Sequence, residues 1–594
     1  MKIEQHTGPN GISFVTFNEK ADRRRVLLKL AAGNVLVYDT ETTGLRVASG
    51  EHECVMIGMM FIDPNSSDST QCFCMPWDND MKHLFEELVE VSSLVVAHGL
   101  RFDSNATGHR LPIVPTKKYF DTQMHVYFRD TAARKSLDDL APAYGYNGGK
   151  KIKTPALVRQ GRIREMDQLE AFEYLADDVL CSGHVFNKVR GDSPSWVENV
   201  DVPLEGVVQR MEQRGAMIIR DRMEEAFQQA LRITAEALDR LQQVGGDINF
   251  NSPKQLPELF KARGWPMGLT KTGNPSITKD ILESMGEGHP NPIARDFAND
   301  LLSWRKHSKL QGSFFGPMLD RLGTSPTGLV HGRFNTMSTK TGRFSCEDPN
   351  WQQASNARGD TESLSYWVRG SITHEGGCTA GDFSQVELRV VAAIAQEPAL
   401  IEAFRKGLDV HAATAAKMFG CAVEDVTPVQ RNAAKAVNFG LLYGMTEFGL
   451  AHQLKCSKDE ALSFMVKHER GLPVLARWKQ ERLAVYEDQG LARTLSGRTR
   501  RYNYYEATKS GLSVEVQGTA AEMMRAALVA LEQENMEPFI QIHDEAVCKG
   551  RGDKKKQAVA SIMQKAAEKA FPKLAELVSF PCDAGDGDNW AEAH

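Results

Sequence analysis

The chain has 594 residues, of which 42% are hydrophobic and 25% are charged, as in an ordinary globular protein. That length predicts several domains rather than one. No apolar run reaches the length of a membrane span, and the ten scattered cysteines lack zinc-type or disulfide-type spacing, which predicts a reducing, cytoplasmic setting. The net charge of −6 decides nothing about binding to polyanions, because such contacts depend on local basic patches.

The first group of acids follows two apolar segments that read as buried strands. The segment 35–38 (VLVY) delivers Asp39 and Glu41, and residues two apart on a strand point to the same face. The segment 94–97 precedes Asp103. Each acid taken alone is more often a helix cap or a surface charge, so the significance lies in the set.

Two further side chains complete that set. Tyr174 and Asp178 lie four residues apart on a predicted helix and therefore share a face; the adjacent Asp177 does not keep this spacing. Four carboxylates and a tyrosine from three segments suit a two-metal phosphodiester hydrolase. Oxygen ligands favour Mg²⁺, which Mn²⁺ can replace.

A boundary and a helical region follow. The segment 191–195 (GDSPS) is rich in Gly, Ser and Pro and predicts a linker between domains. Long amphipathic helices are expected at about 203–245 and 294–322, on either side of a stretch rich in Gly, Pro and Asn.

The segment 381–389 (GDFSQVELR) places Asp382 at the end of a short strand, just before a helix. Ser384 and Glu387 have the spacing of a capping box, which explains Glu387 without any chemistry. Asp382 has no such explanation and requires a partner in an apolar segment.

Two adjacent acids further along the chain, Asp544 and Glu545, are flanked by apolar residues in a predicted hairpin. Two buried, unpaired carboxylates are costly, so they are expected to be exposed, protonated or bound to cations. An acidic turn facing solvent is the alternative. Together with Asp382, the pair favours a metal site.

A helix is predicted to begin at Thr427-Pro428, a favourable N-cap followed by proline. Arg431, Lys435, Phe439 and Tyr443 follow at four-residue intervals and share one face. Two cations one turn apart suit a chain of phosphates, and the aromatic rings beyond them suit a base or a sugar.

Three motifs in this order, DxSQxELR at 382–389, RxxxKxxNFGxxYG at 431–444 and HDE at 543–545, resemble those of family-A DNA polymerases of the bacterial polymerase I type. TKTGRFS at 339–345 and QGTAAE at 517–522 extend the match. The N-terminal acids resemble those of the DEDDy 3′–5′ exonucleases that serve as proofreading domains.

The resemblance implies an α/β multidomain fold: an RNase H-like exonuclease domain followed by a right-hand polymerase, with an antiparallel palm sheet and helical fingers. The expected boundaries are 1–195 for the exonuclease, 196–330 for the thumb, 331–405 and 518–594 for the palm, and 406–517 for the fingers.

The resemblance also implies the roles of the site residues, with two Mg²⁺ ions in each active site. The expected metal ligands are Asp382 and Asp544 for synthesis, and Asp39, Glu41, Asp103 and Asp178 for the nuclease. The other expected catalytic residues are Glu545, Lys435 and Tyr174. The expected nucleotide contacts are Arg431, Lys435, Phe439, Tyr443, Glu387, Gln385 and His411, and the expected DNA contacts are Arg343, Gln517 and His543. A second role for Glu387, besides the cap, is to crowd a ribose 2′-hydroxyl.

Three positions depart from the family pattern. The asparagine often found four residues before the second-motif aspartate is Gly99 here, and an arginine and an asparagine upstream of Gln517 are Lys509 and Ser513. No metal ligand is lost, but the template contacts near Gln517 are in doubt.

The expected partners are primer–template DNA and dNTPs, with a helicase and a single-strand binding protein as replication partners, and the chain is expected to be a monomer.

The stretch before Asp39 is too short for a 5′-nuclease domain, which favours a compact, phage-type replication enzyme in a host cytoplasm. No insertion for a processivity factor is expected in the thumb.

Three other interpretations are a nuclease whose second half only grips DNA, a single-subunit RNA polymerase, and a DNA-binding scaffold without activity. The complete carboxylate sets disfavour the first and third, and the nuclease set with Glu387 disfavours the second.

Overall fold

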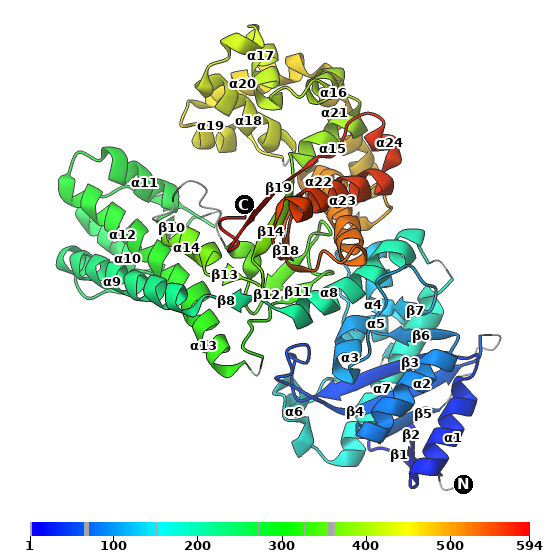
Figure 1. Ribbon diagram of the computed structural model, residues 1–594. Coiled ribbons are helices and arrows are strands. Elements are labelled where there is room, and N and C mark those ends of the chain that lie inside the picture. Colours follow the sequence, from blue (N-terminus) through cyan, green and yellow to red (C-terminus); the bar gives the residue numbers. More distant parts are fainter. Residues whose placement is uncertain are drawn as a thin grey trace.

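The computed structural model describes most of the chain in two parts, a sheet-based domain at the N-terminus and a larger assembly with two helical lobes (Figure 1). The described residues are 3–64, 71–149, 151–191, 193–270, 272–325, 327–354, 360, 363–442, 444–502 and 504–593.

The N-terminal domain is built on a seven-stranded sheet with the order β1-β2-β5-β4-β3-β6-β7. Its strands are β1 (Ile3–Thr7), β2 (Ser13–Phe17), β3 (Val35–Thr42), β4 (Cys54–Ile62), β5 (Cys72–Pro76), β6 (Leu94–Ala97) and β7 (Tyr119–Asp121). Strand β3 pairs antiparallel with β4 and parallel with β6. The predicted strand that carries the first two acids therefore lies inside the sheet.

Helices cover both faces of this sheet (Figure 1). They are α1 (Lys20–Ala31), α2 (Asn79–Val91), α3 (Leu100–Thr107), α4 (Thr122–Arg129), α5 (Leu137–Tyr144), α6 (Ala156–Arg159) and α7 (Gln168–Val189). Leu36 and Tyr38 belong to the core that includes α1 and α2, whereas Val35 and Val37 pack into the core that includes α7. Because strand side chains alternate, the next odd-numbered residues of β3 also face α7.

The centre of the second part is a four-stranded antiparallel sheet with the order β17-β18-β14-β19. Its strands are β14 (Cys378–Phe383), β17 (Pro538–Ile542), β18 (Glu545–Lys549) and β19 (Cys582–Gly587). Helix α23 (Asp553–Ala570) covers one face so closely that a Cβ at Gly381 would lie 2.8 Å from Val559. The opposite face carries Asp382.

The other short strands form two-stranded pairs. They are β8 (Met217–Ile218), β9 (Gly268–Leu269), β10 (Pro275–Ser276), β11 (Arg333–Asn335), β12 (Ser345–Glu347), β13 (Ile372–Thr373), β15 (Leu491–Arg493) and β16 (Thr499–Arg501).

Two helical lobes flank the central sheet (Figure 1). The first consists of α9 (Arg220–Gly245), α10 (Gln255–Arg263), α11 (Lys279–Gly288), α12 (Pro292–Leu310) and α13 (Gly316–Thr324), whereas α8 (Val202–Arg214) lies at the junction with the N-terminal domain. The second consists of α17 (Val410–Phe419), α18 (Pro428–Leu442), α19 (Glu447–Leu454), α20 (Lys458–Gly471) and α21 (Pro473–Gln489). The remaining helices are α14 (Leu364–Gly370), α15 (Val386–Ala395), α16 (Pro398–Arg405), α22 (Tyr504–Gln533) and α24 (Pro572–Ala575).

The tips of the two lobes touch. Lys455, just after α19, lies 2.8 Å from Glu287 of α11, and His452 lies 3.5 Å from Asp280. The first pair is largely exposed, with side chains 73% and 67% accessible. The lobes are thus connected at the tip as well as at the base.

A buried ionic cluster joins the segment after the predicted linker to the central sheet region. Asp201, which is fully buried, accepts hydrogen bonds of 2.7 Å from both Arg498 and Arg525. Arg498 also contacts Glu522 at 3.3 Å, and Arg525 donates to the carbonyl oxygen of Gly342. Two arginines and two acids balance in charge, as burial of such groups requires.

The N-terminal domain contacts the same region directly. The Tyr127 hydroxyl donates to the Thr339 carbonyl at 2.7 Å, and the Thr131 hydroxyl donates to the Lys340 carbonyl at 2.8 Å. The Thr131 amide donates to the Thr499 carbonyl at 2.8 Å. The loop that contains Arg343 is therefore held from both sides.

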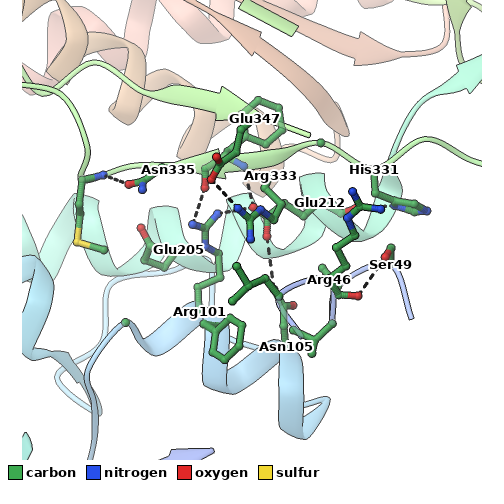
Figure 2. A pocket seen from close by; sticks show the side chains of 18 of the residues that line it. Arg46, Ser49, Arg101, Asn105, Glu205, Glu212, His331, Arg333, Asn335 and Glu347 are labelled. Carbon is green, nitrogen blue, oxygen red and sulfur yellow. Dashed lines mark hydrogen bonds and ion pairs between the residues drawn. The ribbon is translucent and has the colours of Figure 1, made fainter. Parts of the chain in front are cut away.

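A cavity of about 210 Å³ lies at the same junction (Figure 2). Arg101 of α3 reaches across it to α8, where it pairs with Glu205 at 3.0 Å and Glu212 at 2.9 Å. All three side chains are largely buried.

Within the described ranges, no helix combines the length and the apolar character needed to cross a bilayer.

Replacing Asp201 with alanine tests the ionic cluster. The change leaves Arg498 and Arg525 buried without their shared carboxylate, so we expect a loss of about 3–5 kcal/mol in the free energy of unfolding, measured by urea denaturation of the full chain. Glu224→Ala removes the exposed partner of Arg220 and should leave the urea midpoint unchanged. Equal midpoints for both variants would contradict the structural role of Asp201.

Candidate active sites

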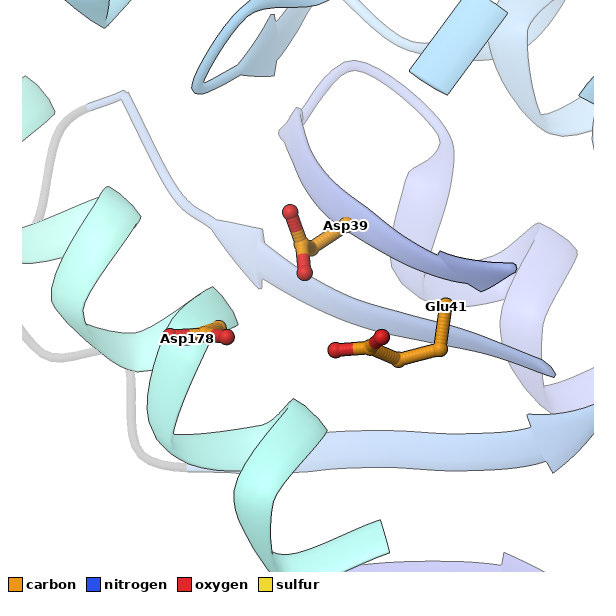
Figure 3. Close-up of side chains that lie close together, drawn as sticks. All are labelled: Asp39, Glu41 and Asp178. Atoms are coloured by element: carbon orange, nitrogen blue, oxygen red, sulfur yellow. The ribbon is translucent and has the colours of Figure 1, made fainter. Parts of the chain in front are cut away.

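The first candidate site lies between β3 and α7. Asp39 and Glu41 of β3 and Asp178 of α7 turn toward one another (Figure 3), and one ligand atom from each lies within 4.8 Å of the other two. The alternation of β3 and the inward face of α7 produce this convergence. Among the described residues searched, these three acids form a group with metal-ligand geometry.

Asp103 completes the set of acids from α3. Its Oδ1 accepts hydrogen bonds from the amide and the hydroxyl of Thr40, at 3.0 and 2.7 Å. Burial still raises the pKa of Asp103 to about 7, although the Thr40 hydrogen bonds oppose this. Burial, followed by repulsion from neighbouring carboxylates, raises the pKa of Asp39 and of Glu41 well above the usual range.

These four acids fit a divalent cation. Buried carboxylates that repel one another are stabilised either by protonation or by a cation, and the oxygen donors of Asp39, Glu41 and Asp178, at the separation given above, suit Mg²⁺ or Mn²⁺. The neighbouring Asp177 is engaged elsewhere, since its oxygens accept from the Tyr146 hydroxyl and the Ile152 amide at 2.7 Å. Of the two adjacent aspartates, Asp178 is the one that faces the cluster.

Lys151 also reaches this site, although it belongs to none of the motifs identified in the sequence. Its ammonium nitrogen lies 2.5 Å from Oδ1 of Asp178 and 5.2 Å from the centre of the Tyr174 ring. The Tyr174 hydroxyl donates to the Thr154 hydroxyl at 3.4 Å. Burial, with repulsion from Asp178, raises the pKa of Tyr174, so its hydroxyl keeps its proton.

The second candidate site lies on the open face of the four-stranded sheet. Asp382 of β14 is paired across the sheet with Glu545 of β18, and the amide of Phe383 donates to the Asp544 carbonyl at 3.2 Å. Asp544 occupies the predicted turn between β17 and β18. Asp382 therefore lies beside the turn that carries Asp544.

Asp544 carries an oxygen that suits a cation. Its Oδ1 is buried without a hydrogen-bond partner among the described residues, and the nearest positive group, Arg343, is 3.9 Å away. Burial raises the pKa of Asp544, although Arg343 opposes the shift. Because buried polar atoms normally have a partner, a buried carboxylate oxygen without a hydrogen bond is a suitable ligand for a metal ion.

Glu545 points away from such a role. One carboxylate oxygen accepts from the Trp590 indole at 2.8 Å, and the other lies 3.3 Å from Arg369. The Arg369 guanidinium in turn lies 4.2 Å from the centre of the Trp590 ring. Glu545 attaches the hairpin to α14 and to the segment after β19, and sequence reasoning missed both partners because they lie far away along the chain.

The predicted capping box at Ser384 and Glu387 is absent, and this expectation was wrong. Helix α15 begins after Gln385, which has a left-handed φ of 54°, so Ser384 is not at the N-cap. The Ser384 hydroxyl donates to Asp583 instead. Glu387 forms an ion pair with Arg343 and accepts from the Gln517 amide at 3.4 Å.

Gln385 is exposed, and Gln517 is half-buried beside Glu387. His543 is exposed in the hairpin turn, where its carbonyl accepts from the Gln541 side chain at 2.7 Å. Arg343, Gln517 and Glu387 are thus brought together at the second site, next to Asp544.

The predicted cationic face of α18 is present. Lys435 is exposed, and the Arg431 guanidinium lies 2.5 Å from Asp409, the N-cap of α17. Phe439 is half-buried on the same face. Tyr443, the last predicted member, lies outside the described residues.

His411 is buried against this helix. Its Nδ1 is 3.2 Å from the Asn438 amide nitrogen, and the other end of that amide contacts His468 of α20 at 2.8 Å. The His411 ring centre is 5.8 Å from that of Phe439. Asn438 therefore locks α17, α18 and α20 together, and the predicted contact of His411 with a nucleotide stays a prediction.

Comparisons with known proteins follow the same division. The family described as "DNA polymerase family A" matches residues 219–592, and "3'-5' exonuclease" matches residues 14–191. The chain belongs to DNA polymerase family A. The predicted fold class, an exonuclease domain followed by a polymerase domain, is thereby confirmed.

The chain is similar to DNA polymerase I of Pseudomonas aeruginosa, with 29% identity over 96% of this chain and 64% of that protein. Thermostable DNA polymerase I of Thermus aquaticus is 33% identical over 71% of this chain and 52% of that protein. The chain thus spans about half to two thirds of the length of these relatives.

A solved structure of the POL domain of Pol1 from M. smegmatis, in complex with DNA primer-template and dNTP, has the same fold. Its TM-score is 0.80 at 21% identity, over 97% of this chain and 99% of that one.

We predict that the stability of the polymerase half depends on pH through His468, the buried histidine of α20. Burial lowers the pKa of His468 to about 4, against about 6.5 in the unfolded chain. The folded state therefore binds fewer protons, and stability falls as the pH drops from about 6.5 toward 4. Between pH 7.5 and 5.0 this group alone contributes a loss of about 2 kcal/mol.

His468→Gln should reduce that loss, while the exposed His83→Gln should not. The comparison is the difference in urea midpoint between the two pH values for each variant. An identical drop in His468→Gln and wild type would show that His468 is protonated without cost.

Proposed function

We propose that this chain is a DNA-directed DNA polymerase that adds deoxynucleotides to a primer 3′ end, and that its N-terminal domain removes nucleotides from the same end. The observation that carries the proposal is the presence of two separate carboxylate centres in one family-A chain, Asp39–Glu41–Asp178 and Asp382–Asp544. The first domain corresponds to residues 1–195.

The division of the second part follows the lobes. Residues 196–330 would form the thumb, 331–405 and 518–594 the palm, and 406–517 the fingers. The M. smegmatis structure holds DNA primer-template and dNTP, and we propose the same two ligands for this chain. A helicase and a single-strand binding protein are proposed as replication partners, with the chain acting as a monomer.

Both centres would hold divalent ions, two in each. Asp382 and Asp544 would bind them in the palm, and Asp39, Glu41, Asp103 and Asp178 in the nuclease. When bound, Mg²⁺ or Mn²⁺ lowers the pKa of the attacking hydroxyl and stabilises the charge on the leaving oxygen. The raised carboxyl pKa values and the unpartnered Asp544 oxygen support this assignment.

The chain's own groups would perform the remaining work of synthesis. Lys435 and Arg431 would bind the triphosphate, for which Arg431 exchanges Asp409 for phosphate oxygens. Lys435 would donate the proton that leaves with pyrophosphate. Phe439, and Tyr443 four residues later in the sequence, would pack against the sugar and the new base pair when the helix closes.

Three other groups would hold the primer end. Arg343, Gln517 and His543 would contact DNA, mainly through backbone and minor groove, because base pairing reads the sequence. Glu545 would act through Trp590 and Arg369 by fixing the hairpin that carries Asp544.

Gln385 and His411 would complete the nucleotide pocket. In the nuclease, the protonated Tyr174 hydroxyl would orient the attacking water. The tyrosine would not act as a general base, because its raised pKa keeps its hydroxyl protonated.

Changing one centre at a time tests the proposal. Asp39→Ala with Glu41→Ala should lower the rate of removal of a mismatched 3′ nucleotide by more than about 100-fold, or about 2.7 kcal/mol of activation free energy, and leave primer extension intact. Asp544→Ala should do the reverse. Both rates are read from gel assays with labelled primer and Mg²⁺. Loss of both activities from either change would contradict two independent centres.

Glu387 offers a test of sugar selection. Glu387→Ala removes the side chain that pairs with Arg343, and ribonucleotide incorporation should rise by at least about 10-fold, or about 1.4 kcal/mol. Glu387→Gln keeps the bulk without the charge and should retain selection, which is measured as the ratio of kcat/KM for the two sugars. If Glu387→Ala rejects ribonucleotides as wild type does, its role is limited to holding Arg343.

A further inference from the structure

The nuclease centre contains a positive side chain that none of its motifs includes. Lys151 lies in the segment between α5 and α6, and its side chain is only 3% exposed. Its ammonium nitrogen is 2.5 Å from Oδ1 of Asp178 and 3.3 Å from Oδ1 of Asp138, on α5. It also donates to the Ile152 carbonyl at 2.9 Å.

The fold holds this lysine in place. The Ile152 amide donates to Asp177 at 2.7 Å, so the backbone next to Lys151 is attached to the helix that carries Asp178. The Tyr146 hydroxyl binds the other oxygen of Asp177 at 2.7 Å. The aliphatic part of Lys151 is buried, and the ammonium lies 5.2 Å from the centre of the Tyr174 ring, at cation–π distance. A surface lysine has none of these constraints.

The position has an electrostatic consequence. Asp178, whose Oδ1 receives the ammonium, belongs to the group of three acids with metal-ligand geometry. A divalent ion bound to Asp178 would lie within a few ångströms of the ammonium, where two cations repel strongly in a buried environment. Lysine and ion therefore compete for the same carboxylate.

The geometry points to Lys151 as the built-in counter-ion of the nuclease carboxylates: it neutralises Asp178 without metal and gives way to the ion by moving to Asp138. This inference rests on the proposed metal-dependent nuclease. Asp138 is 42% exposed, so it can receive the ammonium without entering the metal group. Lys151 is a positioning residue here, since it acts through Asp178.

Two substitutions separate the competition from a simple supporting role. Lys151→Met keeps most of the aliphatic volume and removes the charge, so Mn²⁺ affinity at the nuclease site should tighten by about 10-fold or more, and the metal-free thermal midpoint should fall. Asp138→Asn removes the second acceptor, so Mn²⁺ affinity should weaken several-fold. In the Lys151→Met background, Asp138→Asn should have no effect.

Mn²⁺ binding is measured by electron paramagnetic resonance on the full chain carrying Asp544→Asn, which removes the palm site from the count. Lys153→Met is the matched control, because Lys153 is two residues away and exposed; its affinity should equal that of the Asp544→Asn parent. Asp39→Asn should abolish the signal, which assigns it to the nuclease centre.

Each outcome has a distinct meaning. Unchanged or weaker Mn²⁺ binding in Lys151→Met would overturn the inference while leaving the metal site intact. A parent and a Lys151→Met variant that both fail to bind Mn²⁺ would overturn the proposed nuclease metal site, and the inference with it.

Discussion

The buried carboxylate of Asp201 links the parts of this molecule that must stay in register. It binds two arginines that are themselves fully buried, Arg498 and Arg525. Arg525 then holds the carbonyl of Gly342, immediately before Arg343, which reaches Glu387 and Asp544. A single acid next to the domain junction therefore helps to set the position of the loop that contacts the carboxylates of the central sheet. Such a group tolerates little movement, because separated buried charges are costly.

In both carboxylate centres the negative charges are costly to bury, and each centre places a different basic group beside them. In the nuclease, Lys151 contacts Asp178 directly, at 2.5 Å. At the central sheet, Arg343 lies 3.9 Å from Asp544 and forms its ion pair with Glu387. The lysine carries a compact charge that contacts both Asp178 and Asp138, whereas the planar guanidinium of Arg343 is paired with Glu387. Oδ1 of Asp544 is thus available to an ion, whereas Oδ1 of Asp178 is paired with Lys151, which also contacts Asp138.

Much of both centres could be predicted from short-range spacing. The i, i+2 spacing of Asp39 and Glu41 on a strand, and the i, i+4 spacing of Tyr174 and Asp178 on a helix, determine direction without knowledge of the fold. The hairpin at Asp544 and the start of α18 followed equally from local pattern.

What could not be predicted depends on contacts between distant segments. Arg369 and Trp590 meet Glu545 across 176 and 45 residues, and no local pattern records that pairing. The capping box failed for a related reason: the sequence around Ser384 allows it, but the left-handed conformation of Gln385 and the nearby Asp583 on β19 draw the hydroxyl away.

The contact between the lobe tips has a topological consequence. Lys455 with Glu287 and His452 with Asp280 close a loop of protein whose other side is the central sheet. A duplex lying against that sheet would be encircled, so a covalently closed circle could enter only while the ion pairs are apart. Exposed ion pairs are weak and screened by salt. Ionic strength would therefore control how often the ring stands open, independently of any contact between protein and DNA.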